Sequence, residues 1–224
     1  MFLSNFSTLF PMKTKDLDFL FEELEKNFYS VETELHYSSP FQLLVAVILS
    51  AQCTDERVNK ISPRLFEVFP RVELMAKARQ EQIFEYIKTC SYPNSKAKNL
   101  LGMAQTLLSE FGWIIPKDLD LLQKLPGVWL KTAKVVSHVL YKNPVIAVDT
   151  HVFRVVNRLW LLDKEYASPD KMSEALEKII PDKYKTIAHH SLIYFGRYHC
   201  KARKPQCDSC AFRNFCKYFI RLQK

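Results

Sequence analysis

Apolar residues in this chain of 224 residues recur with the period of an α-helix, and that pattern restricts the fold more than any other feature of the sequence. Apolar residues at i, i+3, i+4 and i+7 form the stripe of an amphipathic helix. The first stripe consists of Leu17, Leu20, Phe21, Leu24 and Phe28. Ser39 and Pro40 are typical of an N-cap and a first helical residue. They precede an almost wholly apolar segment, 41–51, which we expect to be a buried helix.

Three further segments carry helix signals. One helix is expected to begin near Thr54, with Pro63 as a point where it could break. Another stripe follows Ser95 and ends at Gly112, where a glycine commonly terminates a helix. A third helix is expected to lie between the Ser-Pro pair and the proline that bound the segment 168–181. No segment alternates apolar and polar residues between turn signals, so we predict an all-α fold with few or no strands.

Glycine is scarce, with four residues where an average usage of roughly 7% would give about sixteen. The loops of P-loop and dinucleotide-binding proteins need several clustered glycines, so both classes are excluded. The longest aliphatic run, 43–49, is too short to span a bilayer, and the first residues lack the basic region of a signal peptide. We therefore expect a soluble, intracellular, cytoplasmic protein, in which cysteines are metal ligands or free thiols rather than disulfides.

Positive charge gathers near the C-terminus. The formal net charge is +8, and the last 28 residues carry eight basic residues and one acidic residue, Asp208. Such a concentration predicts a polyanionic partner, either nucleic acid or an anionic membrane surface. The alternative is that these basic residues form a solvent-exposed tail that binds no partner.

Four of the six cysteines lie in the same segment with the spacing C-x6-C-x2-C-x5-C: Cys200, Cys207, Cys210 and Cys216. Four thiolates this close in sequence can bind one tetrahedral zinc ion or one cubane iron–sulfur cluster. The gaps of six and five residues differ from the paired C-x2-C knuckles of zinc ribbons, which favours a cluster. The segment is too short to build a core, so we expect the metal to fold it.

The first gap between these cysteines carries three basic residues: Lys201, Arg203 and Lys204. A loop held at both ends by a metal would present them to phosphates at little entropic cost. The other two cysteines, Cys53 and Cys90, are interpreted as core or near-surface thiols. His199 is interpreted as a packing residue rather than a further ligand.

A Pro-Gly turn separates two helical patterns in the segment 125–133, LPGVWLKTA. After the turn at Gly127, the first backbone N–H groups of the next helix are unpaired and can bind a phosphate oxygen. Lys131 lies in or near the first turn of that helix, where the positive end of the helix dipole disfavours an ammonium. It is therefore a candidate amine nucleophile, although a solvated side chain is the ordinary role of such a lysine. Either Asp149 or Thr150 is expected to cap the following helix, so the residues alone make Asp149 a candidate N-cap.

These segments, in this order and at this spacing, resemble the endonuclease III family of helix-hairpin-helix DNA glycosylases. The resemblance rests on LPGVWLKTA, on AVDTHVFRVVNR and on the four-cysteine motif. Two upstream segments agree with it, LSAQCTD at 49–55 and YPNSKA at 92–97.

The resemblance implies an enzyme of base excision repair that removes oxidised pyrimidines from duplex DNA and then nicks the abasic strand. Lys131 occupies the position of the family's nucleophilic lysine, and Asp149 that of its catalytic aspartate. A lysine at this position favours the bifunctional glycosylase/lyase over the mismatch-specific branches. Gln52 matches the residue that fills the gap left by the flipped nucleotide, and Tyr92 lies at the wedge position of the lesion-flanking loop. The four cysteines match the ligands of a [4Fe-4S] cluster.

The implied architecture is the helix-hairpin-helix DNA glycosylase fold, with two helical lobes and a C-terminal iron–sulfur loop. One lobe would span 32–143, and the other would combine 1–31 with 144–224. The active site would lie in the cleft between the lobes, and the cluster at 200–216. The implied partner is double-stranded DNA with an oxidised pyrimidine or an abasic site, with no membrane. We expect a monomer associated with the nucleoid.

The hairpin departs from the family pattern at two positions. Trp129 replaces its second glycine, and Leu130 stands where a polar or basic residue is usual. Because glycine permits positive φ and close approach of the backbone, we expect a weaker phosphate grip or a reshaped turn. Alternatively, the indole packs against DNA or a neighbouring helix. The lesion-flanking loop, residues 90–93 (CSYP), also differs from the family pattern. It lacks the Gly-Leu-Tyr sequence of well-known members.

Two other hypotheses for the function are considered beside the enzyme hypothesis. One is a non-catalytic DNA-binding or redox-sensing protein on the same scaffold, which Trp129 favours and the intact Lys131 and Asp149 oppose. The other is a zinc-bound structural module.

Overall fold

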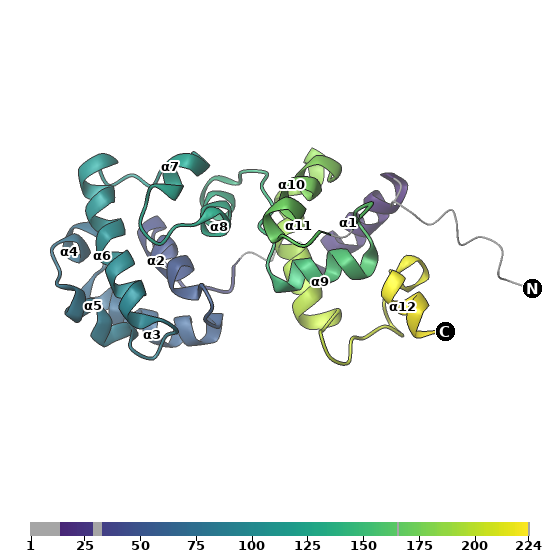
Figure 1. Ribbon diagram of the computed structural model, residues 1–224, viewed down its shortest axis with the longest axis horizontal. Coiled ribbons are helices and arrows are strands. Elements are labelled where there is room, and N and C mark those ends of the chain that lie inside the picture. Colours follow the sequence, from purple (N-terminus) through teal and green to yellow (C-terminus); the bar gives the residue numbers. More distant parts are fainter. Residues whose placement is uncertain (1–13, 29–32, 165, 224) are drawn as a thin grey trace, which may run out of the picture. The chain divides into compact units, whose positions relative to one another are not determined.

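The structure is a computed structural model that describes residues 14–28, 33–164 and 166–223. Every regular element in these ranges is a helix, and no strand occurs among them (Figure 1). The predicted all-α fold is therefore confirmed. None of the helices in these ranges is both long and apolar enough to cross a membrane.

The chain forms two compact units, and each has its own hydrophobic core. One unit is Thr33–Asn143, and the other combines Met1–Glu32 with Pro144–Lys224. The first contains α2 (Pro40–Ser50), α3 (Asp55–Val68), α4 (Val72–Ala76), α5 (Gln80–Ile87), α6 (Pro93–Glu110), α7 (Leu119–Gln123) and α8 (Leu130–Tyr141). The second contains α1 (Thr14–Phe28), α9 (Thr150–Leu159), α10 (Pro169–Ile179), α11 (Asp182–Tyr194), the π-helix η2 (Phe195–His199), the 3-10 helix η3 (Arg213–Phe215) and α12 (Lys217–Leu222).

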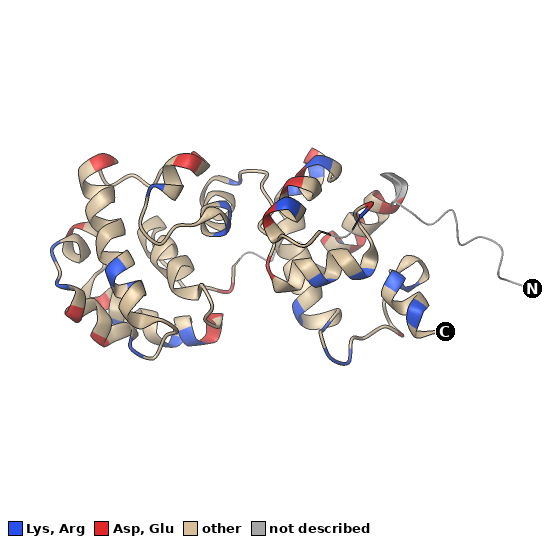
Figure 2. Cartoon of the chain, in the orientation of Figure 1, with Lys and Arg blue, Asp and Glu red and all other residues tan. Residues whose placement is uncertain are grey.

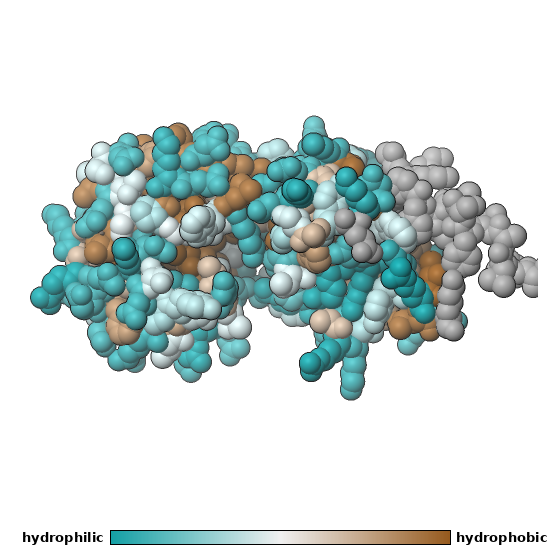
Figure 3. All heavy atoms as spheres, viewed as in Figure 1, coloured by the Kyte–Doolittle hydropathy of each residue, from teal (hydrophilic) through white to brown (hydrophobic). Residues whose placement is uncertain are grey.

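Helix α2 lies in the core of the Thr33–Asn143 unit. All its residues from Gln42 to Leu49 are buried, and α3, α6 and α8 contact it. The Ser39 hydroxyl caps its N-terminus by accepting a hydrogen bond from the Gln42 N–H at 3.2 Å. A helix that is apolar on every side must be covered on every side, so the predicted buried helix is confirmed. Figure 3 shows the mainly hydrophilic surface over this core, with some hydrophobic patches.

Two boundaries differ from the sequence prediction. The break considered at Pro63 does not occur, because α3 continues through this residue. The helix begins at a Thr54 cap, and its buried face offsets the cost of an interior proline, about 3 kcal/mol. α6 begins at Pro93, before the expected Ser95. The glycine expected to end that helix does so, since Gly112 adopts a φ of +54° directly after the C-cap.

In the second unit, α1 packs along α11, so the N-terminal helix and the C-terminal half of the chain share one core. The rings of Phe21 and Tyr184 stack with centroids 5.3 Å apart. Beside them, Asp18 pairs with Lys183 at 2.8 Å and accepts a hydrogen bond from the Tyr184 hydroxyl at 3.0 Å. The cysteine segment joins the same core through Cys200.

Candidate functional site

The Pro-Gly turn that precedes α8 is a tight turn, as predicted. Gly127 has a φ of +81°, and a Cβ atom at this position would lie 2.8 Å from Asn99 Cβ. The position therefore requires glycine both for its backbone angle and for the space around it. The Val128 N–H closes the turn on the Leu125 carbonyl at 3.0 Å.

Trp129 is the N-cap residue of α8, with φ −88° and ψ 170°. This is ordinary extended backbone, so replacing the family's glycine does not strain the turn. The indole is 77% exposed, so packing against a neighbouring helix is not its role. No side chain caps this helix. The N–H groups of its first turn are therefore available to a phosphate oxygen, as the sequence suggested.

Lys131 is the second residue of α8, and its side chain is exposed. Its ammonium forms no ion pair or hydrogen bond with any other described residue. A nucleophilic amine must reach its substrate without first breaking a bond within the protein. The position of Lys131 meets this requirement.

Asp149 is the N-cap of α9. Its Oδ1 atom accepts hydrogen bonds from the backbone N–H groups of His151 and Val152, both at 2.8 Å. These two bonds cap the helix and fix the orientation of the carboxylate. The other carboxylate oxygen has no hydrogen-bond partner within the described chain. One oxygen therefore caps the helix, while the other remains free to take part in chemistry.

Gln52 and Tyr92 share a left-handed backbone, each with a φ of +54°. Both side chains are exposed, and Tyr92 by 64%. This conformation costs about 1–3 kcal/mol for a residue other than glycine, and such strain gathers at functional sites. Lys204, in the basic loop, has a φ of +51°. Three of the residues expected to contact DNA therefore have strained backbones.

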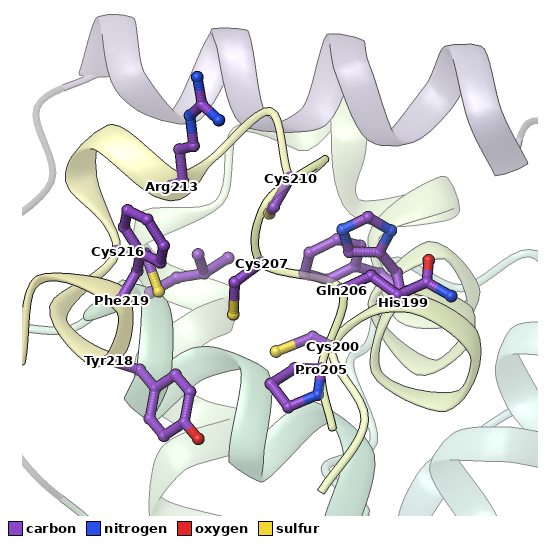
Figure 4. Close-up of a pocket in the computed structure, with 12 residues that line it drawn as sticks. His199, Cys200, Pro205, Gln206, Cys207, Cys210, Arg213, Cys216, Tyr218 and Phe219 are labelled. Atoms are coloured by element: carbon purple, nitrogen blue, oxygen red, sulfur yellow. The ribbon is translucent and has the colours of Figure 1, made fainter. Parts of the chain in front are cut away.

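The four C-terminal cysteines line a single cavity in the second unit, and Figure 4 shows their sulfur atoms around it. Cys200 follows η2 and Cys216 precedes α12, while the other two lie on the intervening loop. Leu159 and Phe195 contribute apolar walls. Within the described chain, no three His, Cys, Asp or Glu side chains are grouped as ligands of a single metal ion.

Without a bound cation, burial and mutual repulsion in this cavity disfavour the thiolate forms of the cysteines. Burial and, to a smaller extent, the charges of the neighbouring sulfur atoms raise the pKa of the Cys210 thiol to about 11. The same two causes raise the pKa values of Cys207 and Cys216. A positively charged centre bound by all four would reverse this balance, because coordination favours the thiolate. The donor set thus fits a metal centre.

Two arginines of α9 hold the first part of the cysteine loop. Arg154 donates from Nε to the Cys200 carbonyl at 2.9 Å and from Nη2 to the Gly196 carbonyl at 2.6 Å. Arg158 donates from Nη1 to the Lys201 carbonyl at 2.7 Å and to the Cys200 sulfur at 3.4 Å. Sequence reasoning missed both residues. Their i, i+4 spacing in a predicted helix was the available signal.

The three basic residues of the loop, Lys201, Arg203 and Lys204, are all exposed. Figure 2 shows basic residues along α9, on the loop after α11 and on α12. The loop closes through a hydrogen bond from the Gln206 N–H to the His199 carbonyl at 3.1 Å. The His199 ring stacks on Phe195 with centroids 5.1 Å apart, as expected of a packing residue.

Comparison with known proteins identifies related sequences and structures. The family model described as HhH-GPD superfamily base excision DNA repair protein matches residues 45–182. Endonuclease III of Rickettsia conorii is 43% identical over 212 residues, covering 95% of this chain and 100% of the relative. Endonuclease III of Escherichia coli K12 is 42% identical over 206 residues, covering 92% and 96%. The structure of a trapped endonuclease III–DNA covalent intermediate, an estranged-adenine complex, superposes with a TM-score of 0.89 at 38% identity, covering 96% of this chain and 100% of the other.

Proposed function

Because the chain belongs to the endonuclease III family, we infer that it excises oxidised pyrimidines from duplex DNA and then nicks the abasic strand. It is a bifunctional DNA glycosylase and abasic-site lyase of base excision repair. The observation that carries the chemistry is Lys131, an exposed amine without a partner in the described chain, at the start of a helix that no side chain caps.

We propose that Lys131 is the nucleophile of the first step. The damaged nucleotide leaves the base stack, which costs a few kcal/mol and is cheapest for a damaged base. The Lys131 amine then forms a bond to C1′ of the sugar, while the bond from C1′ to the base breaks and the base leaves with a proton. Phosphates beside the nucleotide would be held by the first-turn N–H groups of α8 after the turn at Gly127.

We propose that Asp149 assists at the same sugar. Opening of the sugar ring gives a Schiff base between Lys131 and C1′, and this makes the C2′ proton acidic. Loss of that proton lets its electron pair expel the 3′ phosphate, which nicks the strand. The free oxygen of Asp149 can accept a proton or stabilise positive charge on the sugar, while its Oδ1 atom remains fixed by the helix cap.

The remaining DNA contacts are proposals for exposed residues. Gln52 would fill the gap left by the flipped nucleotide, and Tyr92 would act as a wedge beside it. Their left-handed backbones support these roles, because the strain positions the two side chains at no further cost on binding. The basic loop would bind phosphates through Lys201, Arg203 and Lys204.

We propose that the four cysteines hold a [4Fe-4S] cluster. A cubane takes one thiolate at each of its four irons, so its ligands surround a volume instead of meeting at a point. The ring of sulfur atoms around the cavity fits this arrangement better than the zinc alternative. When bound, the cluster supplies a positive centre that fixes the loop, and the arginines of α9 hold that loop by its carbonyls.

Two broader features follow as proposals. We propose that the compact units Thr33–Asn143 and Met1–Glu32 with Pro144–Lys224 are the two domains of the enzyme. We also propose that the protein works in the cytoplasm as a monomer associated with the nucleoid, where its substrate lies.

Borohydride trapping tests the proposed chemistry. Borohydride reduces a Schiff base to a stable bond, so wild-type protein should become covalently attached to a duplex that contains thymine glycol and to one that contains an abasic site. Lys131→Gln should form no adduct while still binding DNA. Lys124→Gln is the matched control, because it removes one exposed positive charge near the same hairpin. It should weaken binding slightly and leave trapping intact.

Each other outcome has a definite meaning. An adduct with Lys131→Gln would contradict the assigned nucleophile. No adduct with the wild type, in protein that binds DNA, would support the non-catalytic rival. For the metal, Cys207→Ser should remove the brown colour of the purified protein, whereas Cys53→Ser should keep it. Colourless wild-type protein with bound zinc would support the structural module instead.

A further inference from the structure

A buried lysine near the start of α6 has no part in the reaction proposed above. Lys96 is 5% exposed, and its ammonium donates hydrogen bonds to the Leu49 carbonyl at 2.8 Å, the Ala51 carbonyl at 2.7 Å and the Cys90 sulfur at 3.3 Å. A buried charge is costly unless its surroundings compensate for it. Lys96 forms no ion pair with a carboxylate of the described chain, so the backbone carbonyls supply this compensation.

The two carbonyls belong to the C-terminal end of α2. The last carbonyls of a helix have no partner within it and form the negative end of its dipole, where a lysine ammonium is favourable. α2 ends at Ser50 with Ala51 as its C-cap, and Lys96 binds the carbonyls on both sides of Ser50. The Ser50 carbonyl itself accepts a hydrogen bond from the Cys53 N–H at 3.1 Å. Lys96 therefore caps the end of α2 from a neighbouring helix.

Lys96 also bonds next to both of the exposed residues that are expected to enter the DNA. The Ala51 carbonyl belongs to the peptide unit that leads into Gln52, so the ammonium fixes the plane of that peptide. The backbone N–H of Lys96 donates to the Tyr92 carbonyl at 3.1 Å. A single residue thus holds a peptide unit at Gln52 and another at Tyr92, and all of these contacts lie within the Thr33–Asn143 unit.

The left-handed backbones of Gln52 and Tyr92 need such support. Each has a φ of +54°, and a strained conformation persists only where the surrounding structure determines it. The two side chains are exposed and make no hydrogen bond within the described chain, so they do not provide that support themselves. It must come from contacts to the backbone, and the bonds of Lys96 are contacts of this kind.

We propose that Lys96 is a positioning residue that fixes Gln52 and Tyr92 relative to each other, so that both side chains enter the duplex together. This inference rests on the proposed function, because it takes the gap-filling role of Gln52 and the wedge role of Tyr92 from there. Lys96 acts through these residues and not on the DNA, since its ammonium is buried and already bonded.

The step that depends on this positioning is extrusion of the damaged nucleotide. Unstacking a paired base costs free energy, and side chains that enter the duplex repay it. Side chains that are already held in place lose little freedom when they enter. Without the Lys96 ammonium, the peptide before Gln52 can rotate and the two side chains no longer move as a pair. Extrusion should then slow, whereas the bond-making steps at the sugar should not.

Lys96→Met tests this expectation, because it nearly keeps the length of the side chain and removes its charge and donors. With protein in excess over a thymine glycol duplex, excision should slow by about ten- to a hundredfold. Nicking of an abasic-site duplex should slow by less than about threefold, since no paired base must be unstacked. Lys98→Met is the matched control, because it removes an exposed ammonium from the same helix. It should excise and nick at nearly the wild-type rates.

A double-mutant cycle separates positioning from general loss of stability. In a Gln52→Ala/Tyr92→Ala background, adding Lys96→Met should slow excision by less than about twofold further, because nothing remains for Lys96 to position. Extrusion can also be followed without chemistry in Lys131→Gln, with 2-aminopurine beside the lesion. Its fluorescence rises when the lesion leaves the stack, and adding Lys96→Met should reduce that rise at saturating protein, while Lys98→Met should not.

Two results would overturn the proposal. One is excision by Lys96→Met as fast as by Lys98→Met. The other is an equal loss of rate from Lys96→Met with and without Gln52 and Tyr92, which is the behaviour of a lysine that only stabilises the fold. Should urea denaturation show that Lys96→Met does not fold, Lys96→Gln takes its place in the same cycle, since it keeps an N–H donor without the charge.

Failure of the proposed function gives a different pattern. A wild type that nicks neither duplex would count against the enzyme itself. If Gln52→Ala/Tyr92→Ala excises thymine glycol at the wild-type rate, the two DNA contacts are wrong, and the role of Lys96 falls with them. If that variant is slow while Lys96→Met is not, the contacts stand and only the role of Lys96 is wrong.

Discussion

Two helices of this protein begin in opposite ways, and each carries a residue proposed to act on DNA at its start. At α9 the Asp149 carboxylate satisfies the first N–H groups, so the helix end is complete within the protein. At α8 the N-cap is Trp129, whose side chain caps nothing and is largely exposed to solvent. The N-terminus of α9 is thus stabilised by its cap, whereas the N–H groups at the start of α8 have no capping side chain.

The difference shows how one kind of element serves two chemical purposes. A capped N-terminus holds its capping side chain in one place, which suits a carboxylate that must remain charged and oriented. An uncapped N-terminus gives up about 1 kcal/mol of stability and keeps N–H groups free for a phosphate. If the proposed function is correct, the uncapped start of α8 leaves N–H groups next to Lys131 free to bind a phosphate of DNA.

Substitutions at Asp149 separate the cap from the chemistry and should have the largest effect. Asn caps a helix as well as Asp does, so Asp149→Asn should retain stability while base excision falls by about a hundredfold or more. Asp149→Ala should lose the same activity and, in addition, about 1 kcal/mol of unfolding free energy. Single-turnover excision and urea denaturation measure the two effects. Equal excision rates of Asp149→Asn and wild type would show that this residue acts only as a helix cap.

Gly127→Ala should be next in size, because it disturbs the turn that positions the open end of α8. A Cβ there would meet Asn99 at 2.8 Å on a backbone with φ +81°, so we expect a loss of about 2 kcal/mol in unfolding free energy. Gly112→Ala is the matched control, since φ is also positive but nothing lies within 4 Å of the added atom. It should cost about 1 kcal/mol. Equal losses in the two variants would show that the Asn99 contact is unimportant.

Much of this contrast could be read from the sequence. The buried α2, the glycine turn and a capping residue at the start of α9 depend on neighbours within a few positions, and local patterns predicted them. The candidate reactive residues came from motif spacing and family resemblance, which preserve the identity of a residue but say nothing of its partners.

The rest depended on contacts between distant parts of the chain. Arg154 and Arg158 bond to carbonyls more than 40 residues away, so no local pattern revealed what they hold. The left-handed backbones of Gln52 and Tyr92 follow from their surroundings, since both residue types ordinarily avoid this conformation. Trp129 misled in the opposite direction. A reshaped turn was one of the alternatives for this residue, but the positive φ lies at Gly127 and position 129 is extended.

The smallest effect tests most directly whether the α8 start is kept open for DNA. The extended backbone at Trp129 suits a capping residue, so Trp129→Asp should raise the unfolding free energy by about 1 kcal/mol. The same carboxylate would occupy the free N–H groups and repel phosphate, so affinity for duplex DNA should fall by about tenfold. Trp129→Ala removes the indole without adding a cap, and it separates loss of the ring from gain of the carboxylate. If Trp129→Asp is more stable yet binds DNA as tightly as Trp129→Ala, the open helix end does not bind phosphate, and the two helix starts differ for a reason unrelated to DNA.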